Sequence, residues 1–252
     1  MGRAQERPDA VIIDSHVHAG HGEALQHPWD TLADIEVSLR RMDKLGIDKA
    51  VVLPINSSDY RRANRETSEI VAGHPDRLVG YAKVDQARDA GRVDEILTEA
   101  FGRLGLVGLK LHGYPTREVM DAVLKHDVPM LVDPLNEPAP LQYAAEQYPG
   151  VHMVIAHFGS FPSHNHHAHQ QAIWLAKTFP NVYLDTSSVT HFEWLEAGVK
   201  ELGPEKIIFG SDGPVLHCGV ELAKIGFLKL SKKARDRILC RNIAQLLGKK
   251  LA

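Results

Sequence analysis

The sequence lacks several features that mark common protein classes. Its 252 residues include only two cysteines and no Cys-x-x-Cys, so neither a disulfide framework nor a thiolate zinc site is encoded. No apolar run approaches the roughly 20 residues that span a bilayer. The polar start, residues 1–9, contains no apolar segment of a secretory signal. A formal net charge of −3 gives no reason to expect nucleic acid or an anionic membrane as a partner. We therefore expect a cytoplasmic protein that acts on a small molecule, and a homo-oligomer stays open.

The chain also lacks a linker rich in proline, glycine or serine, and it has no Gly-x-Gly-x-x-Gly or Walker sequence. An open doubly wound sheet would carry such a phosphate-binding turn after an early strand. What the chain does contain is eight short apolar runs that alternate with segments of helical periodicity, which is typical of a parallel sheet. Eight units in about 250 residues match a (β/α)8 TIM barrel, so we predict one barrel domain over residues 1–252. The predicted strands are residues 11–18, 49–53, 77–84, 105–112, 128–133, 151–157, 181–185 and 206–212.

Between the first two strands, residues 31–34 resemble a capping box. This pattern predicts a helix from Thr31 to about Leu45, closed by Gly46.

The first apolar run ends in two histidines that are separated by one residue, His16 and His18. In a strand these side chains point to the same face, with Cα atoms roughly 6.5 Å apart. Their rings can therefore converge on one metal ion. A His-x-His pair alone is equally compatible with ordinary histidines at a strand end, so the other strand ends decide.

Polar side chains of the kinds that bind metals or act in catalysis stand at the carboxyl ends of five predicted strands. In a barrel these ends share one mouth, where the chemistry of such folds takes place. Nitrogen and carboxylate ligands without thiolates suit Zn²⁺, Mn²⁺ or Fe²⁺. The sequence thus predicts a divalent metal site at the mouth. The residues are His16, His18, Lys110, His112, Asp133, His157 and Asp212.

Several ordered motifs resemble those of the amidohydrolase superfamily, in particular the branch that holds amidohydrolase-related hydrolases and aminocarboxymuconate-semialdehyde-type decarboxylases. Any one of them alone is weak, but the ordered set spans nearly the whole chain. The motifs lie at Ile13–His18, Gly108–His112, Val154–Gly159, Phe209–Pro214 and Asn242–Gly248.

The resemblance implies that His16, His18 and Asp212 bind the metal, and that Asp212 also handles protons. It makes His157 either a ligand or a catalytic group that polarises the substrate. Where the family usually has a histidine ligand after the fifth strand, this chain has Asp133. A carboxylate can replace imidazole as a ligand and favours a harder ion such as Mn²⁺. Zinc is the expected ion, with manganese or iron as alternatives. Metal-free operation, with Asp133 outside any ligand set, also stays open, because some relatives work without metal.

Lys110 is predicted to point into the barrel, where a charged group is costly unless it is paired or modified. It could bind an anionic substrate, pair with Asp133 or Asp212, or be carboxylated, and we favour the first two roles. His112 lies two residues further on the same face, so we predict that both residues, together with His157, bind substrate. The tract at residues 164–169, which holds four histidines, could serve the site or form a solvated loop.

These residues together predict a metal-dependent hydrolase of a small carboxylated amide, lactone or ester. A metal-activated water would attack, with Asp212 as general base. One alternative is a non-oxidative decarboxylase on the same scaffold. Another is a degenerate barrel that binds a ligand without turnover.

Overall fold

Nine strands form one curled sheet in the computed structural model, which describes residues 11–23 and 31–251. The polar residues 1–9 and both ends of the predicted domain lie outside these ranges. The strand order is β2-β1-β3-β4-β5-β6-β7-β8-β9, and only β2 is antiparallel to its neighbour. The strands are β1 Ile13–Gly22, β2 Thr31–Ala33, β3 Lys49–Pro54, β4 Leu78–Lys83, β5 Gly108–His112, β6 Met130–Asp133, β7 Met153–Ile155, β8 Val182–Asp185 and β9 Ile207–Ile208.

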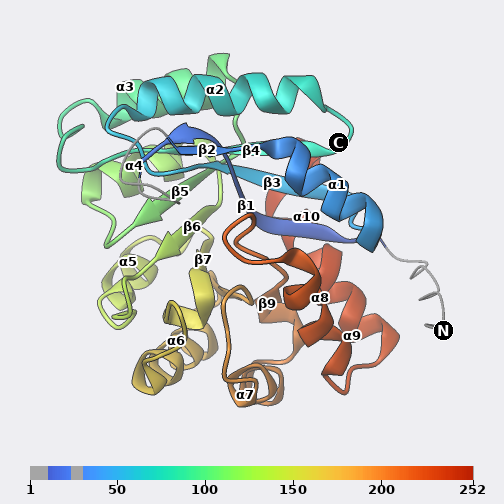
Figure 1. Cartoon of the computed structure of the whole chain (residues 1–252). Helices are drawn as coiled ribbons and strands as arrows, with labels where there is room; N and C mark the ends of the chain where they lie inside the picture. Colours follow the sequence, from blue (N-terminus) through green and yellow to red (C-terminus); the bar gives the residue numbers. More distant parts are fainter. Residues whose placement is uncertain (1–10, 24–30, 252) are drawn as a thin grey trace.

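The helices that join the strands lie outside the curled sheet and cover its convex face (Figure 1). Parallel strands joined by helices are buried on both faces, which explains the nearly continuous apolar runs of the sequence. No described helix is both long enough and apolar enough to cross a bilayer. The helices are α1 Ile35–Leu45, α2 Tyr60–Gly73, α3 Val93–Thr98, α4 Arg117–His126, α5 Leu141–Gln147, α6 His166–Thr178, α7 Glu193–Leu202, α8 Cys218–Phe227, α9 Lys232–Asp236 and α10 Asn242–Leu247.

Alternate residues of the strands pack into two separate cores. Leu109 and Leu111 of β5 join the larger core between the sheet and the helices. Leu131 of β6 joins a smaller inner core, which also contains Ile243 of α10. Because side chains alternate along a strand, Lys110 shares the inner face. On the inner face, the side chains are therefore apolar near the amino ends of the strands and polar near their carboxyl ends.

The two ends of the sheet meet beside β1. Val17 forms a parallel bridge with Gly213, and the backbone N–H of His18 donates to the Gly213 carbonyl at 2.6 Å. The N–H of Ser15 donates to the carbonyl of Phe209 at 3.0 Å. These contacts place the segment after β9 against the first strand, an arrangement that is consistent with the predicted barrel.

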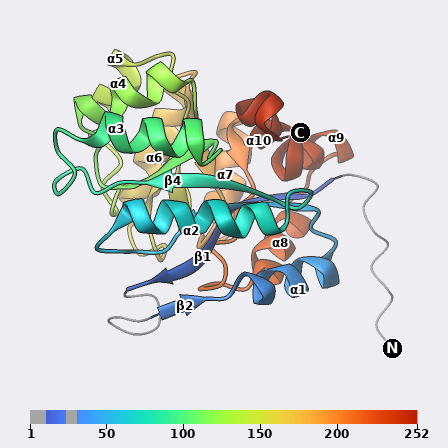
Figure 2. The ribbon, with the colours of Figure 1, turned by 90° about the horizontal axis from the view of Figure 1, so that it is seen from above.

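The predicted start of the first helix is wrong. Residues Thr31–Ala33 form β2, which pairs with residues 20–22 at the outer end of β1 (Figure 2). Because these residues pair with β1, they adopt the extended conformation of a strand, and not the helical conformation that the capping-box pattern predicted. The helix is capped by Asp34, whose side chain accepts from the N–H of Glu36, and it ends as predicted at Gly46, where φ is 70°. Each predicted strand overlaps an observed strand.

Candidate metal centre

Two histidines at the mouth are oriented by acceptors behind their rings. Nδ1 of His16 lies 3.3 Å from Oδ2 of Asp185, and Nδ1 of His18 lies 3.1 Å from the carbonyl oxygen of Pro54. A ring nitrogen that faces such an acceptor carries the hydrogen, which leaves Nε2 with a free lone pair. Both rings thus present an unprotonated Nε2 to the interior of the mouth.

Asp212 completes a convergent group with these rings. Its Oδ1 atom lies 3.4 Å from Nε2 of His16 and 3.3 Å from Nε2 of His18. Two ligands that sit about 2.1 Å from a metal ion are roughly 3.0–3.4 Å from each other, for octahedral and tetrahedral geometry respectively. The spacing therefore fits a bound cation. The three facing atoms are all hydrogen-bond acceptors, and in these tautomers neither ring places a hydrogen between them. Their closeness therefore also favours a bound cation.

The electrostatics of the three residues favour the same conclusion. Burial, reinforced by the charge of Lys110, lowers the pKa of His16 to about 4, and burial lowers the pKa of His18. Burial opposes ionisation of Asp212, but His16 and His18 outweigh it and hold its pKa below the ordinary value. At neutral pH all three side chains are in the unprotonated form that binds metal.

Two buried lysines line the mouth next to this group. Lys83 of β4 and Lys110 of β5 are register partners on adjacent strands. Nζ of Lys110 lies 3.4 Å from Nε2 of His16, and Nζ of Lys83 donates to Oδ1 of Asn56 at 2.7 Å. Burial lowers the pKa of both lysines. Sequence analysis missed Lys83, although it stands near the end of a predicted strand, in the same position as Lys110.

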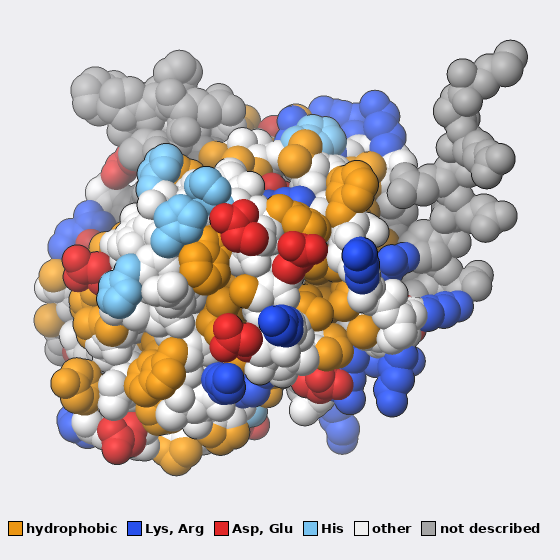
Figure 3. Space-filling model, turned by 90° about the horizontal axis from the view of Figure 1, so that it is seen from below, with side chains coloured by type: hydrophobic (Ala, Val, Ile, Leu, Met, Phe, Trp, Pro, Cys, Tyr) orange, Lys and Arg blue, Asp and Glu red, His pale blue; other side chains and the backbone are white. Residues whose placement is uncertain are grey.

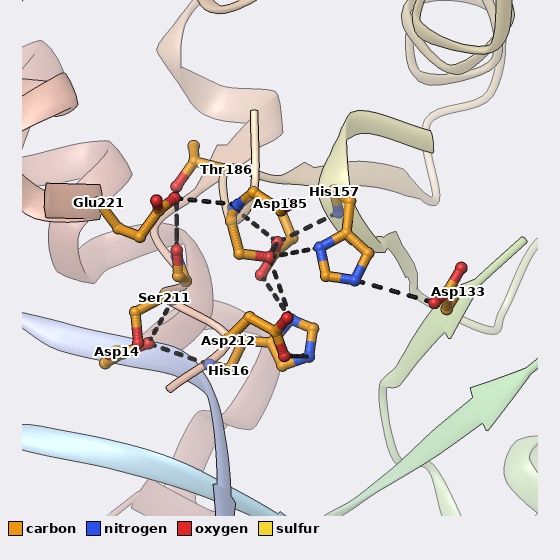
Figure 4. Close-up of polar contacts among 12 residues, drawn as sticks. Asp14, His16, Asp133, His157, Asp185, Thr186, Ser211, Asp212 and Glu221 are labelled. Atoms are coloured by element: carbon orange, nitrogen blue, oxygen red, sulfur yellow. Dashed lines mark hydrogen bonds and ion pairs between the residues drawn. The ribbon is translucent and has the colours of Figure 1, made fainter. Parts of the chain in front are cut away.

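Asp133 lies on the far side of the mouth from Asp212 (Figure 4). Its Oδ2 atom is 3.7 Å from Nε2 of His112 and 3.8 Å from Nε2 of His157. Among the described residues, two groups of three ligand atoms converge closely enough to hold a metal, and neither includes Asp133. They are His16, His18 and Asp212, and His16, His157 and Asp185. Ligation by Asp133 therefore stays a prediction, and its contacts favour a pairing with the two histidines.

His157 reaches the mouth through an unusual backbone conformation. Strand β7 ends early, and a short turn, Ala156–Gly159, follows with φ of 58° at His157 and 48° at Phe158. The left-handed region costs a residue with a side chain roughly 1–2 kcal/mol. Asp212 adopts it as well, with φ of 57°. Such strain is typical of functional sites and accords with the positions of both residues.

The histidine tract at residues 164–169 begins helix α6 and does not enter either convergent group. His169 is buried, and its ring bonds the carbonyl of Phe158 at 2.9 Å and the hydroxyl of Ser163 at 2.8 Å. His166 is exposed, and its ring lies tilted by 49° against that of His191, with centroids 4.8 Å apart. Histidine side chains gather on one face of the molecule (Figure 3). The buried part of the tract thus fixes the turn that carries His157.

The motifs and the fold now allow the chain to be placed. The sequence pattern of the amidohydrolase family matches residues 13–249. The chain belongs to the amidohydrolase family. Searched by sequence alone, curated proteins give no significant match.

Solved structures of the same fold include decarboxylases and a hydrolase. A 5-carboxyvanillate decarboxylase from Novosphingobium aromaticivorans, complexed with manganese, is 14% identical with a TM-score of 0.74, covering 97% of this chain and 98% of its own. A dihydroxybenzoic acid decarboxylase from a Polaromonas species, with bound manganese, is 19% identical with a TM-score of 0.70, covering 94% and 97%. A "probable 2-pyrone-4,6-dicarboxylic acid hydrolase" from Acinetobacter baumannii is 18% identical with a TM-score of 0.74, covering 94% and 99%.

These likenesses show a shared fold over nearly the full length of each chain. Two of these three proteins are decarboxylases and one is a probable hydrolase. Manganese, and not zinc, is the ion in the two decarboxylases.

Proposed function

We propose that this chain is a metal-dependent, non-oxidative decarboxylase of a small hydroxylated aromatic or enolic carboxylic acid, built on a closed (β/α)8 barrel. The observation that carries the proposal is the convergence of Nε2 of His16, Nε2 of His18 and Oδ1 of Asp212 at the mouth. Three unprotonated ligand atoms meet there, next to buried cationic side chains that can receive a carboxylate.

His16, His18 and Asp212 would hold the ion, and the manganese-bound decarboxylases of the same fold support Mn²⁺ as the preferred one. A divalent ion in this position supplies a positive charge that orients the acid and its neighbouring oxygen.

The residues around the ligands divide the remaining tasks. Lys110 and His112 bind the substrate carboxylate, and the burial of Lys110 strengthens its attraction for an anion. When the bond to that carboxylate breaks, its electron pair stays on the ring or enolic carbon and carbon dioxide leaves. His157 takes up a proton from solvent at Nε2 and delivers it to that carbon, and Asp133, with Oδ2 3.8 Å from Nε2, pairs with the intervening imidazolium.

The burial of the site suits this reaction. His16, Lys110 and His157 are at most 3% exposed. A carboxylate that enters such a site exchanges its water shell for fixed protein charges and donors, which favours its loss as neutral carbon dioxide.

A panel of acids tests the proposal. The Mn²⁺-loaded protein is incubated with 2,6-dihydroxybenzoate, 5-carboxyvanillate and 2-pyrone-4,6-dicarboxylate, and both carbon dioxide release and ring opening are measured. We expect carbon dioxide from a hydroxylated aromatic acid, and none from His16→Ala or Asp212→Ala. Ring opening of the pyrone without carbon dioxide release would assign the chain to hydrolysis. Binding of the acids without any product would assign it to the non-catalytic alternative.

Hydrolysis remains the second candidate because of Asp212. Its carboxylate is held ionised beside the ligand histidines, which is the state that a general base needs. The dicarboxylic acid hydrolase of the same fold supports this reading, with a lactone as substrate.

A further inference from the structure

Asp185, at the end of β8, is a buried carboxylate that the sequence analysis passed over. Its Oδ1 atom accepts the backbone N–H of Ser187 at 2.9 Å, the backbone N–H of His157 at 3.3 Å, and the hydroxyl of Ser187. Its Oδ2 atom faces Nδ1 of His16 at 3.3 Å. Burial alone would raise its pKa, but the neighbouring His16 and the donors hold the pKa below the ordinary value. One fully buried anion therefore accepts three hydrogen bonds at Oδ1 and faces the ring of His16 at Oδ2 (Figure 4).

The contacts of Ser187 extend the influence of this carboxylate to a second ring. Because the hydroxyl hydrogen of Ser187 is directed at Asp185, its oxygen is free to accept from Nδ1 of His157, 2.8 Å away. The same oxygen lies 3.3 Å from Nδ1 of His16. The hydroxyl of Ser187 thus lies within hydrogen-bond distance of His16, His157 and Asp185.

We propose that Asp185 is a positioning residue that sets the tautomer of two site histidines. It holds the hydrogen of His16 on Nδ1 directly, and the hydrogen of His157 on Nδ1 through Ser187. Nε2 of His16 is thereby kept free for the metal, and Nε2 of His157 is kept free for proton transfer. The inference rests on the proposed metal site, but it also makes a claim about the metal-free rings.

Gly210 gives independent support, because the backbone leaves space for this arrangement. A Cβ atom at Gly210 would lie 2.0 Å from Oδ2 of Asp185 and 2.9 Å from Cβ of His16. The glycine lets the carboxylate and the ring lie side by side without a side chain between them.

Asp185→Asn tests the tautomer directly. Since three donors face Oδ1, the amide oxygen must take that position, and the amide NH2 then faces Nδ1 of His16. Nδ1 becomes the acceptor, the hydrogen moves to Nε2, and the lone pair for the metal is lost. We expect the affinity for Mn²⁺ and for Zn²⁺, measured by chelator competition, to fall about 10- to 100-fold, as for other orienting partners of metal-binding histidines.

Nitrogen-15 NMR of the metal-free protein supplies a readout that a merely structural role would not move. We expect Nδ1–H for His16 and His157 in the wild type, Nε2–H for His16 in Asp185→Asn, and a change confined to His157 in Ser187→Ala. Glu221→Gln is the matched control, because Glu221 is also buried but bonds Ser188 and Lys224 and neither histidine. It should leave metal affinity and both tautomers unchanged.

Two results would overturn the inference. One is a hydrogen on Nε2 of His16 in the wild-type protein, and this observation does not depend on a variant that folds. The other is wild-type metal affinity in a folded Asp185→Asn protein. If the wild type binds neither Mn²⁺ nor Zn²⁺, the proposed function fails, while the NMR spectrum still decides the claim about the tautomers.

Discussion

The ammonium nitrogen of Lys110 lies 3.4 Å from Nε2 of His16, the atom that the proposed site assigns to the metal. A metal ion bound to Nε2 of His16 and a charged Lys110 beside it repel each other. Two unit charges about 4 Å apart at an effective dielectric constant near 20 interact with roughly 4 kcal/mol. Burial lowers the pKa of Lys110 and so reduces this conflict by favouring the neutral amine. In its charged form, Lys110 therefore opposes metal binding and favours anion binding.

Lys110→Met should tighten metal binding and weaken substrate binding. A divalent ion doubles this repulsion to roughly 8 kcal/mol, so if about a sixth of it survives in the wild type, Mn²⁺ affinity rises about tenfold in the variant. The KM for the acid substrate should rise as well, because the buried positive charge is lost. Isothermal titration with Mn²⁺ and steady-state kinetics measure the two effects. Lys125→Met is the control, because Lys125 is exposed and forms its ion pair with Asp94, outside the proposed site. Weaker Mn²⁺ binding in Lys110→Met would show that the lysine supports the ion.

Metal binding should persist to lower pH than at ordinary histidine sites. The pKa of His16 is lowered to about 4 and that of His18 is also lowered. A ligand with a lowered pKa stays unprotonated until the pH falls to that value, so protons compete little above it. We expect protonation of His16 to reduce Mn²⁺ affinity little between pH 7 and pH 5, and the total fall to be smaller than two histidines of unperturbed pKa would give. A histidine of unperturbed pKa, about 6.5, would lose more than tenfold per ligand over that interval. Binding titrations at several pH values measure the difference.

The alternation of strands and helices was predictable because each segment carries its own periodic pattern. The positions of the polar side chains at the strand ends were predictable for the same reason. Side chains alternate between the two faces of β5, and this alternation decides which side of the sheet Lys110 faces. Thr31–Ala33 was predicted wrongly because its partners at the outer end of β1, Gly20–Gly22, lie 9 to 13 positions earlier in the chain. A local capping pattern does not contain information on such pairing.

The roles of the residues behind the rings could not be predicted. Asp185 ends a predicted strand and could have been noted as another strand-end carboxylate. Its link to His16, however, depends on the absence of a side chain at Gly210 and on the turn that carries His157. These residues are brought together where the segment after β9 lies against β1. Spacing in the sequence therefore indicates candidate ligands and leaves their orientation open.

Asp133→Asn distinguishes the two roles that Asp133 could have, partner of the imidazolium and metal ligand. Its contacts with His112 and His157 favour a partner of the imidazolium, so we expect kcat to fall about 10- to 100-fold while Mn²⁺ affinity changes less than threefold. Asp212→Asn is the comparison, because loss of a convergent ligand should abolish tight binding. If Asp133→Asn weakens Mn²⁺ binding as much as Asp212→Asn does, Asp133 is a ligand, as the family position predicts.

Gly210→Ala should damage the metal site without replacing any of the proposed ligands. Its methyl group would meet Oδ2 of Asp185 at 2.0 Å, so the carboxylate must move away from His16. Overpacking of this kind costs about 1–3 kcal/mol of unfolding free energy, measured by urea denaturation. Displacement of Asp185 should also lower Mn²⁺ affinity about tenfold or more. Gly226→Ala in α8 is the matched control, since nothing lies within 4 Å of its added methyl group. There the helix should gain up to about 1 kcal/mol from the better helix former. Equal metal affinity in the two alanine variants would mean that His16 keeps its orientation without the carboxylate.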